Sequence, residues 1–206
     1  MAHAERRAAL RILYGIPCAG KSTAAISVAT HHGLRTVIGT DYLREVQRLL
    51  TPPQQAPALR MVTHTAWQRH GPPTRDNIAT GFREHVAAVA PAIHAVVAKL
   101  ARDGFDAVLE GAHFHGDLIG ELRTAYPELA LHATVLAVGS ADELRQRIAA
   151  KERTRAAVSE RKAWAEHVPV LMMLQDLLHA DARSHGIPVT TSEGLLTCSP
   201  HNPCCC

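Results

Sequence analysis

The stretch that most constrains this chain is residues 15–22, which read Gly-Ile-Pro-Cys-Ala-Gly-Lys-Ser. They fit the pattern G-x-x-x-x-G-K-[ST]. Residues 10–14 before them predict a short buried strand, and the Ala-rich run 23–30 after them predicts a helix. Two glycines leave the backbone of such a turn open to close approach, and its N–H groups meet an anion at the helix N-terminus. The stretch therefore predicts a phosphate-binding loop.

Each part of this loop has an expected role. Lys21 would reach the β- and γ-phosphates of a nucleoside triphosphate, and Ser22 would coordinate Mg²⁺. We therefore predict ATP and Mg²⁺ as the bound groups, with Lys21 also catalytic. The residues expected to hold the nucleotide are Gly15, Pro17, Cys18, Ala19, Gly20, Lys21, Ser22 and Thr23.

The length and net charge of the chain indicate how many domains it forms and whether it binds nucleic acid. A chain of 206 residues suits one domain with a substantial core, so we predict a single domain over 1–206. Aromatic residues make up only 4%, so the core must rest on Ala, Val, Leu and Ile. The formal net charge of +3 is too mild to favour a nucleic-acid partner. The composition leaves the oligomeric state open.

The ends of the chain bear on its location. Uninterrupted apolar runs stay well short of the roughly 20 residues of a membrane span, and residues 1–7 lack the apolar core of a signal peptide. Four of the five cysteines lie within 198–206, which is not the spaced framework of a secreted disulfide scaffold. We therefore expect a cytoplasmic protein with no membrane contact.

Short apolar runs alternate with helical patterns along the rest of the chain. The further predicted strands are 35–38, 105–109, 129–138 and 187–190. The further predicted helices are 42–50, 74–101, 117–126, 141–153 and 159–185. The proline pairs at 52–53 and 72–73 interrupt regular structure, so 51–73 is interpreted as irregular, and 192–206 as an irregular tail. The alternation predicts an α/β fold with a parallel sheet covered on both faces.

The longest helical pattern, 74–101, contains Pro91, which predicts a kink or a break between two helices. Apolar residues recur along it at spacings of three and four. We expect these to be core residues and not a binding stripe: Phe82, Val86, Val89, Ile93, Val97 and Leu100.

Polar residues follow the second and third predicted strands. Asp41 comes after 35–38, and Glu110 and His113 come after 105–109. Ligands of parallel sheets bind beyond the carboxyl ends of the strands, so these side chains should meet the phosphate-binding loop. Asp41 is the expected base or acceptor anchor, Glu110 is expected near the metal, and either carboxylate could take the other role. Asp41 could instead cap the next helix, and Glu110 could make a structural hydrogen bond.

His113 is expected to contact the substrate. It also forms an H-x-H pair with His115, but without a clear third ligand we do not expect a transition-metal site. The tail cysteines Cys198 and Cys204 to Cys206 have no predicted role in catalysis.

Two groups of arginines could meet anions. Arg44 and Arg48 lie four apart on a predicted helix, hence on one face, and could bind an anionic acceptor. A basic run over about 145–162 could form a lid that neutralises a transferring phosphate, with Arg153 and Arg155 as its catalytic cations. The alternative for both groups is an ordinary solvated surface.

Three blocks of the chain resemble the 2-phosphoglycerate kinase family. They are residues 15–23, residues 37–46 (Val-Ile-Gly-Thr-Asp-Tyr-Leu-Arg-Glu-Val) and residues 109–113 (Leu-Glu-Gly-Ala-His), and the run 174–189 is similar too. The resemblance implies a small P-loop kinase with strand order 2-3-1-4-5 and a mobile lid. That family usually carries Arg-Phe and a later Arg in its lid, whereas here Ile148 follows Arg147 and Lys151 takes the later basic position.

The leading hypothesis is an ATP-dependent kinase that acts on a hydroxyl of 2-phosphoglycerate or another small anionic compound. One alternative is a nucleoside-, antibiotic- or RNA-directed kinase on the same scaffold. Another is a regulator that binds ATP without catalysis. A carboxylate at Asp41 favours the enzyme, because a pure switch needs no base for an acceptor.

Overall fold

The computed structural model describes residues 6–154 and 163–197. Its centre is a five-stranded parallel sheet in the order β2-β3-β1-β4-β5, as the resemblance implied. Leu10 of the central strand lies beside Ala107 on one side and Leu131 on the other. The strands are β1 (Ala8–Tyr14), β2 (Val37–Gly39), β3 (Ala107–Gly111), β4 (Leu129–Ala137) and β5 (Val189–Thr191).

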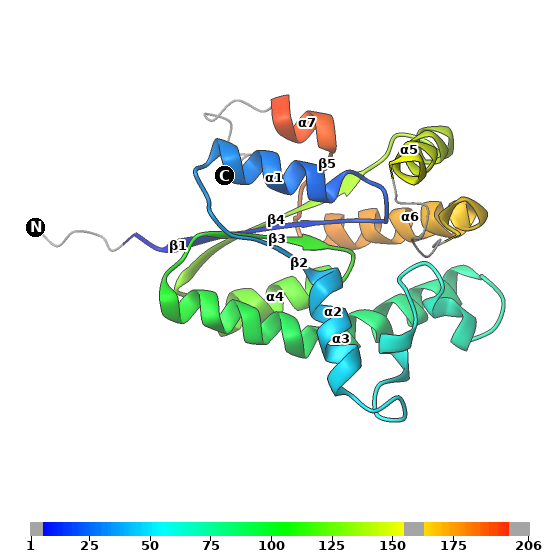
Figure 1. The fold of residues 1–206 in the computed structure, drawn as a ribbon, viewed down its shortest axis with the longest axis horizontal. Helices are drawn as coiled ribbons and strands as arrows, with labels where there is room; N and C mark the ends of the chain where they lie inside the picture. The colour runs from blue at the N-terminus through cyan, green and yellow to red at the C-terminus, as the bar shows by residue number, and fades with distance from the viewer. Residues whose placement is uncertain (1–5, 155–162, 198–206) are drawn as a thin grey trace, which may run out of the picture.

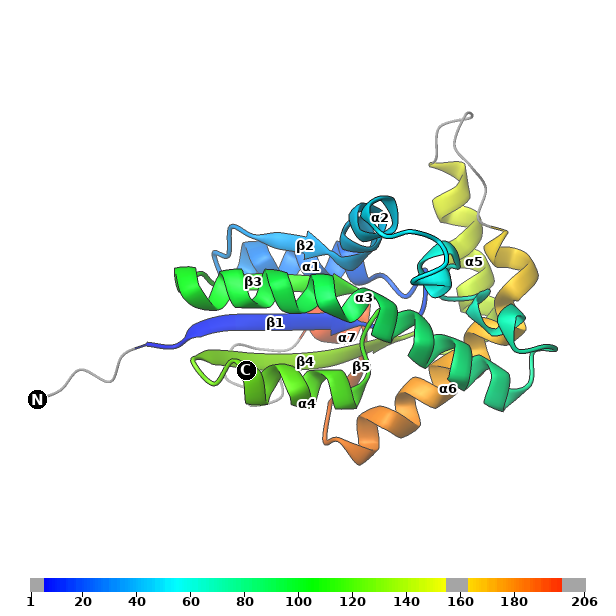
Figure 2. The same cartoon turned by 90° about the horizontal axis from the view of Figure 1, so that it is seen from below.

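Helices cover both faces of this sheet, as predicted. Helices α1 (Lys21–His31) and α7 (Ser192–Thr197) lie on one face, and α3 (Arg75–Asp103), α4 (Gly116–Ala125) and α6 (Val168–Ser184) lie on the other (Figure 1). Figure 2 shows α2 (Thr40–Leu50) and α5 (Ala141–Arg153) towards the carboxyl ends of the strands. One hydrophobic core joins sheet and helices, and a single domain over the whole chain stays a prediction.

The central strand shows why the sheet forms. Leu10, Ile12 and Tyr14 are almost completely buried, and Leu13 between them is buried as well. A parallel strand with helices on both faces must be apolar on both sides, which is the pattern that residues 10–14 predict.

Helix α3 is continuous through Pro91, so the expected break is wrong. In the turn before the proline, Gln47 Nε2 of α2 donates to the Ala88 carbonyl at 2.7 Å. Proline leaves the carbonyl of Ala87 without its helical donor, and the bond from Gln47 goes to the next carbonyl, so it ties α2 to this turn of α3 and does not replace the lost bond.

Helix α3 also supplies much of the core. All six predicted core residues, from Phe82 to Leu100, are buried. Among the described residues, α3 is the helix that is long and apolar enough to cross a membrane. Core helices of globular domains pass the same test of length and composition, so this is weak evidence for a span.

Other expected boundaries need correction. Residues 51–73 contain two short 3₁₀ helices, Pro57–Arg60 and Ala66–Arg69, because prolines end regular helices but permit single turns. Another 3₁₀ turn, Trp164–His167, precedes α6, and residues 155–162 lie outside the described part. Residues 192–197 form α7, so the tail is not irregular from 192, and 198–206 are not described.

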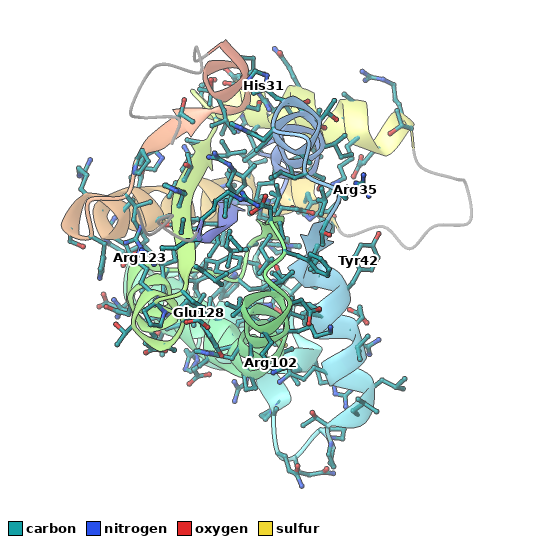
Figure 3. All side chains as sticks on the ribbon, turned by 90° about the vertical axis from the view of Figure 1, so that its left-hand side faces the viewer. His31, Arg35, Tyr42, Arg102, Arg123 and Glu128 are labelled. Atoms are coloured by element: carbon teal, nitrogen blue, oxygen red, sulfur yellow. The ribbon has the colours of Figure 1, made fainter. Side chains whose placement is uncertain are left out.

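Basic residues at the ends of helices lie at the amino-terminal end of the sheet (Figure 3). His31, Arg102 and Arg123 lie in the last turns of α1, α3 and α4. Basic side chains at helix C-termini complement the helix dipole. The cavity described next lies at the opposite end of the strands.

Candidate functional site

The loop between β1 and α1 requires its glycines. Gly15 has a φ of +150°, and a Cβ there would lie 2.2 Å from the Leu136 carbonyl oxygen of β4. Gly20 precedes α1 with a φ of +89°, where a side chain is strained and would meet Ser192. At both positions the backbone angle and the neighbouring protein atoms therefore require glycine.

Lys21 begins α1 and is 9% exposed. Its Nζ donates to the Ile16 carbonyl at 2.8 Å, which folds the side chain back over the loop. Burial lowers the pKa of the ammonium, and the carboxylates of Glu110 and Asp41 oppose that shift. The site thus holds a buried cation between the loop and the two predicted carboxylates.

Ser22 and Glu110 lie together, as the predicted metal site requires. Ser22 Oγ in the first turn of α1 donates to Glu110 Oε1 at 3.0 Å. Glu110 is the penultimate residue of β3 and not part of a loop, because the strand runs on to Gly111. Hydroxyl and carboxylate oxygens are hard donors that suit Mg²⁺.

Among the described residues, no group of three His, Cys, Asp or Glu side chains could form a complete metal cage. Mg²⁺ in nucleotide sites usually takes only one or two protein ligands and completes its shell with phosphate oxygens and water. The Ser22–Glu110 pair therefore fits a nucleotide-bound Mg²⁺.

A cavity of about 70 Å³ opens beside this pair. Its walls come from the phosphate-binding loop, the start of α2, the end of β3, the segment 62–64, the end of α5 and Trp164. The predicted residues that line it are Pro17, Cys18, Lys21, Ser22, Asp41, Arg44, Glu110 and His113.

Asp41 lies in the first turn of α2, and the helix is capped by the extended residue Gly39. The capping interpretation of Asp41 is therefore wrong, because the helix begins at Thr40, two residues earlier than expected. Its side chain is 67% exposed at the cavity, and its Oδ1 lies 3.9 Å from His113 Nε2. This position leaves the carboxylate accessible to a ligand.

Arg44 is a buried cation on the next turn of α2, with a side chain 8% exposed. Its Nη1 donates to the Met61 carbonyl at 2.6 Å, and its Nη2 pairs with Glu45. Its Nε is buried and has no hydrogen-bond partner among the described residues. A buried donor without a partner is costly, so a ligand that accepts from it would be favoured.

Arg48 does not join Arg44 at the cavity. It pairs with Glu45 at 2.7 Å on the exposed side of α2 and is absent from the cavity walls. The two arginines share a helix face, but Glu45 lies between them and holds Arg48 away from the cavity. The structure therefore does not bring Arg48 to the cavity, and its contact with substrate stays a prediction.

His113 is buried at the wall of the cavity, and both its ring nitrogens already have protein partners. Nδ1 lies 2.7 Å from Thr40 Oγ1, and Nε2 lies 3.1 Å from His85 Nε2. Its neighbour His115 caps α4, where its Nδ1 accepts from the Leu118 N–H at 3.3 Å. The two histidines of the H-x-H pair thus make separate hydrogen bonds, His113 to Thr40 and His85 and His115 to the N-terminus of α4.

The predicted lid is only partly described. Arg153 ends α5, is exposed and does not line the cavity, and Arg155 lies outside the described residues. Lys151 does line the cavity, with its Nζ 4.8 Å from the centre of the Trp164 ring. A cation over an aromatic face is held by the ring's quadrupole.

Sequence reasoning missed the part of the cavity wall made by Val62, Thr63 and His64. His64 is buried, and its ring lies 5.1 Å from that of His167. These residues lie between two proline pairs in a region without periodicity, so no sequence signal placed them at the site. The scarcity of aromatic residues could have drawn attention to Trp164.

Comparisons with known proteins show what the whole chain is similar to. The 2-phosphoglycerate kinase of Pyrococcus furiosus is 35% identical over 182 residues, which are 87% of this chain and 58% of that protein. The enzyme of the same name from Pyrococcus horikoshii is 33% identical over 185 residues, with the same coverage. The chain thus spans less than two thirds of the length of these relatives.

Among solved structures, shikimate kinase from Acinetobacter baumannii is 14% identical, with a TM-score of 0.48, over 89% of this chain and 83% of that one. The family model described as "AAA domain" matches residues 10–167, from the central strand through the phosphate-binding loop to the turn before α6. Since this match covers well over half of the sequence, the chain belongs to the AAA domain family.

Proposed function

We propose that this chain is an ATP-dependent kinase that transfers the γ-phosphate of ATP to a hydroxyl of a small anionic acceptor such as 2-phosphoglycerate. The observation that carries the proposal is a single cavity that joins Lys21, Asp41 and Arg44. These are a cation for the transferring phosphate, a base for a hydroxyl and a buried cation for an anionic group. The names of the relatives support this choice of acceptor.

The residues divide the reaction between them. The acceptor hydroxyl gives its proton to Asp41 as its oxygen forms the new bond to the γ-phosphorus, and ADP leaves with the electrons of the broken P–O bond. Lys21 stabilises the charge on the transferring phosphoryl group. A Mg²⁺ ion held by Ser22 and Glu110 would neutralise phosphate charge.

Arg44 explains a preference for an anionic acceptor. Its guanidinium is buried with one N–H unpartnered, and carboxylate or phosphate oxygens are the acceptors that match this group best. 2-Phosphoglycerate carries both groups and one free hydroxyl. We propose ATP–Mg²⁺ and this acceptor as the partners, and the cytoplasm as the location.

Phosphate transfer from γ-labelled ATP tests the function directly. The panel contains 2-phosphoglycerate, 3-phosphoglycerate, glycerate, a nucleoside, an aminoglycoside and a short RNA. Labelled product is expected with the anionic hydroxy acids, foremost 2-phosphoglycerate. Labelling of only the nucleoside, the antibiotic or RNA would assign the acceptor to another class. Tight nucleotide binding with no transfer to any compound would indicate a regulator.

Arg44→Ala should raise the KM for the acceptor about tenfold or more, with little change in the KM for ATP. A charged contact made equally in the ground and transition states behaves in this way. Arg44→Lys should restore only part of the affinity, because an ammonium cannot replace a planar guanidinium. Arg48→Ala, on the same helix but away from the cavity, is the matched control and should leave both constants unchanged. Equal losses for both substrates would assign Arg44 a structural role.

Lys151→Ala should lower turnover about tenfold, whereas Arg153→Ala should change it little. Both residues lie on the last turns of α5, but only Lys151 lines the cavity. A cation that meets the transferring phosphate acts mainly on turnover. Steady-state kinetics of the two variants decide between them. A larger loss in Arg153→Ala would restore the assignment made from the sequence.

A further inference from the structure

A chain of buried hydrogen bonds runs beside the cavity and has no part in the chemistry described above. Thr40 Oγ1 lies 2.7 Å from His113 Nδ1, and His113 Nε2 lies 3.1 Å from His85 Nε2. His85 Nδ1 lies 2.9 Å from the Ala58 carbonyl oxygen. Thr40, His85 and His113 are each at most 1% exposed.

The carbonyl at one end fixes the direction of every bond in this chain. A carbonyl oxygen only accepts, so His85 Nδ1 carries a hydrogen. A neutral His85 then has a bare Nε2, which accepts from Nε2–H of His113. His113 is left with a bare Nδ1, which accepts from the Thr40 hydroxyl. This direction of the bonds applies when both rings are neutral, since a proton added to either one would set two N–H groups against each other at 3.1 Å or reverse the bond to Thr40, whose hydroxyl would then accept.

The surroundings of the two rings favour the neutral form. Burial lowers the pKa of His85, and so does Arg44, while the hydrogen bond to Ala58 and the charge of Asp41 act in the opposite direction. Burial also lowers the pKa of His113, with further lowering from His85, Arg44 and Lys21 against the opposing charge of Asp41.

The chain of hydrogen bonds connects four separate parts of the site. Thr40 is the first residue of α2 and directly precedes Asp41, the proposed base, in the sequence. His113 follows β3, and His85 lies on α3. Ala58 begins the segment 58–64, which ends in the residues that line the cavity.

Two of the side-chain contacts that hold the segment 58–64 are those of His85 to the Ala58 carbonyl and of Arg44 to the Met61 carbonyl. Inside the segment, the Ala58 carbonyl also accepts from the Met61 N–H at 3.1 Å. A loss of the histidine contact would therefore loosen the wall that Thr63 and His64 contribute.

We propose that His85 and His113 are positioning residues whose directed hydrogen bonds hold Asp41 and the segment 58–64 in the arrangement that acceptor binding requires. The proposal rests on the proposed kinase function for its link to the acceptor, but not for the hydrogen-bond chain itself. In this proposal neither histidine binds substrate directly, although His113 lines the cavity, because the ring nitrogens of both are bonded within the protein. Their effect is on the acceptor side of the cavity, because the hydrogen bonds given above do not reach the phosphate-binding loop.

The hydrogen-bond chain can be tested without activity. Imidazole ¹⁵N spectra of the full chain should show His85 as the neutral Nδ1–H tautomer and His113 as the neutral Nε2–H tautomer. Both should stay neutral at about pH 6, where an ordinary histidine is mostly protonated. The opposite tautomer of either ring, or a charged ring at that pH, would overturn the proposal.

The wall can be tested by amide hydrogen exchange. His85→Phe keeps a ring of similar shape but removes both nitrogens, and should speed exchange at Leu59 and Met61 about tenfold. These two N–H groups donate to the carbonyls of Ala56 and Ala58. His94→Phe is the matched control, because His94 lies on the same helix, contacts Tyr126 and does not line the cavity. Equal exchange in both variants would show that His85 does not hold the segment.

Steady-state kinetics then test whether the hydrogen-bond chain affects acceptor binding. His85→Phe should raise the acceptor KM about tenfold with the ATP affinity within twofold, and His94→Phe should change neither. For His113, Gln keeps a donor at the position of Nε2 and should retain more acceptor affinity than Ala. If amide exchange in the segment 58–64 becomes faster and the acceptor KM does not change, the positioning role is wrong. If the wild-type chain phosphorylates no hydroxy acid, the kinase proposal fails, while the tautomers and the exchange rates still decide the hydrogen-bond chain.

Discussion

Lys21→Met is expected to lower turnover by about 100-fold or more while the protein stays folded. The side chain is buried against the phosphate-binding loop, and in the proposed reaction its charge stabilises the phosphate that is transferred. The loss of one such interaction in a preorganised site typically costs 100- to 1000-fold in rate, or about 3 to 4 kcal/mol of transition-state stabilisation. Methionine keeps most of the aliphatic length and removes only the charge and the donor.

The matched control for this variant is Lys99→Met. Lys99 is 63% exposed on α3, pairs with Asp103 and lies outside the cavity. Turnover and the melting temperature of both variants are measured together. Near-normal turnover in a folded Lys21→Met protein would remove the phosphate-binding role of residues 15–22. A melted protein would indicate instead that the bond from Nζ to the Ile16 carbonyl is needed for folding, and Lys21→Arg would then separate the two roles.

The fold could be predicted largely from the sequence, because its information is local. Apolar runs such as 10–14 and the glycine pattern at 15–22 specify strand, turn and helix with little help from distant residues. The alternation of such units then restricts the sheet to a parallel one. Of the two outcomes expected at Pro91, a kink or a break, the continuous helix α3 contradicts only the break.

The site was predictable where it follows the ends of strands. Ser22 and Glu110 are 88 residues apart and still meet, because β1 and β3 are neighbours and their carboxyl ends coincide. Asp41 reaches the same cavity for the same reason, since β2 lies beside β3.

The rest of the site depends on how an irregular segment packs, which local patterns do not encode. The choice between Arg44 and Arg48 is made by Glu45 and by the Met61 carbonyl, neither of which a helical spacing reveals. His85 was also invisible to sequence reasoning, because a single histidine on a core helix has no partner until α3 packs against the turn after β3.

Asp41→Asn separates the kinase from a regulator that only binds nucleotide. The substitution keeps the size of the side chain and removes its charge and basicity. As the acceptor's base, Asp41 acts on the hydroxyl and not on ATP, so affinity for ATP–Mg²⁺ should change less than about threefold. Transfer to the acceptor should fall about 100-fold or more, which is the usual contribution of a positioned general base.

Asp117→Asn is the control for effects on helix stability. Asp117 also lies in the first turn of a helix and is exposed to a similar degree, but it does not line the cavity. Nucleotide titration, transfer and thermal melting are measured on both variants. Both should lose at most about 1 kcal/mol of helix-dipole stabilisation, and Asp117→Asn also changes the contact with His185 at 3.1 Å. A fall in transfer that is confined to Asp41→Asn would therefore be chemical and not structural. Intact transfer would remove Asp41 from the mechanism, and lost nucleotide binding in a folded protein would move its carboxylate to the metal site beside Glu110.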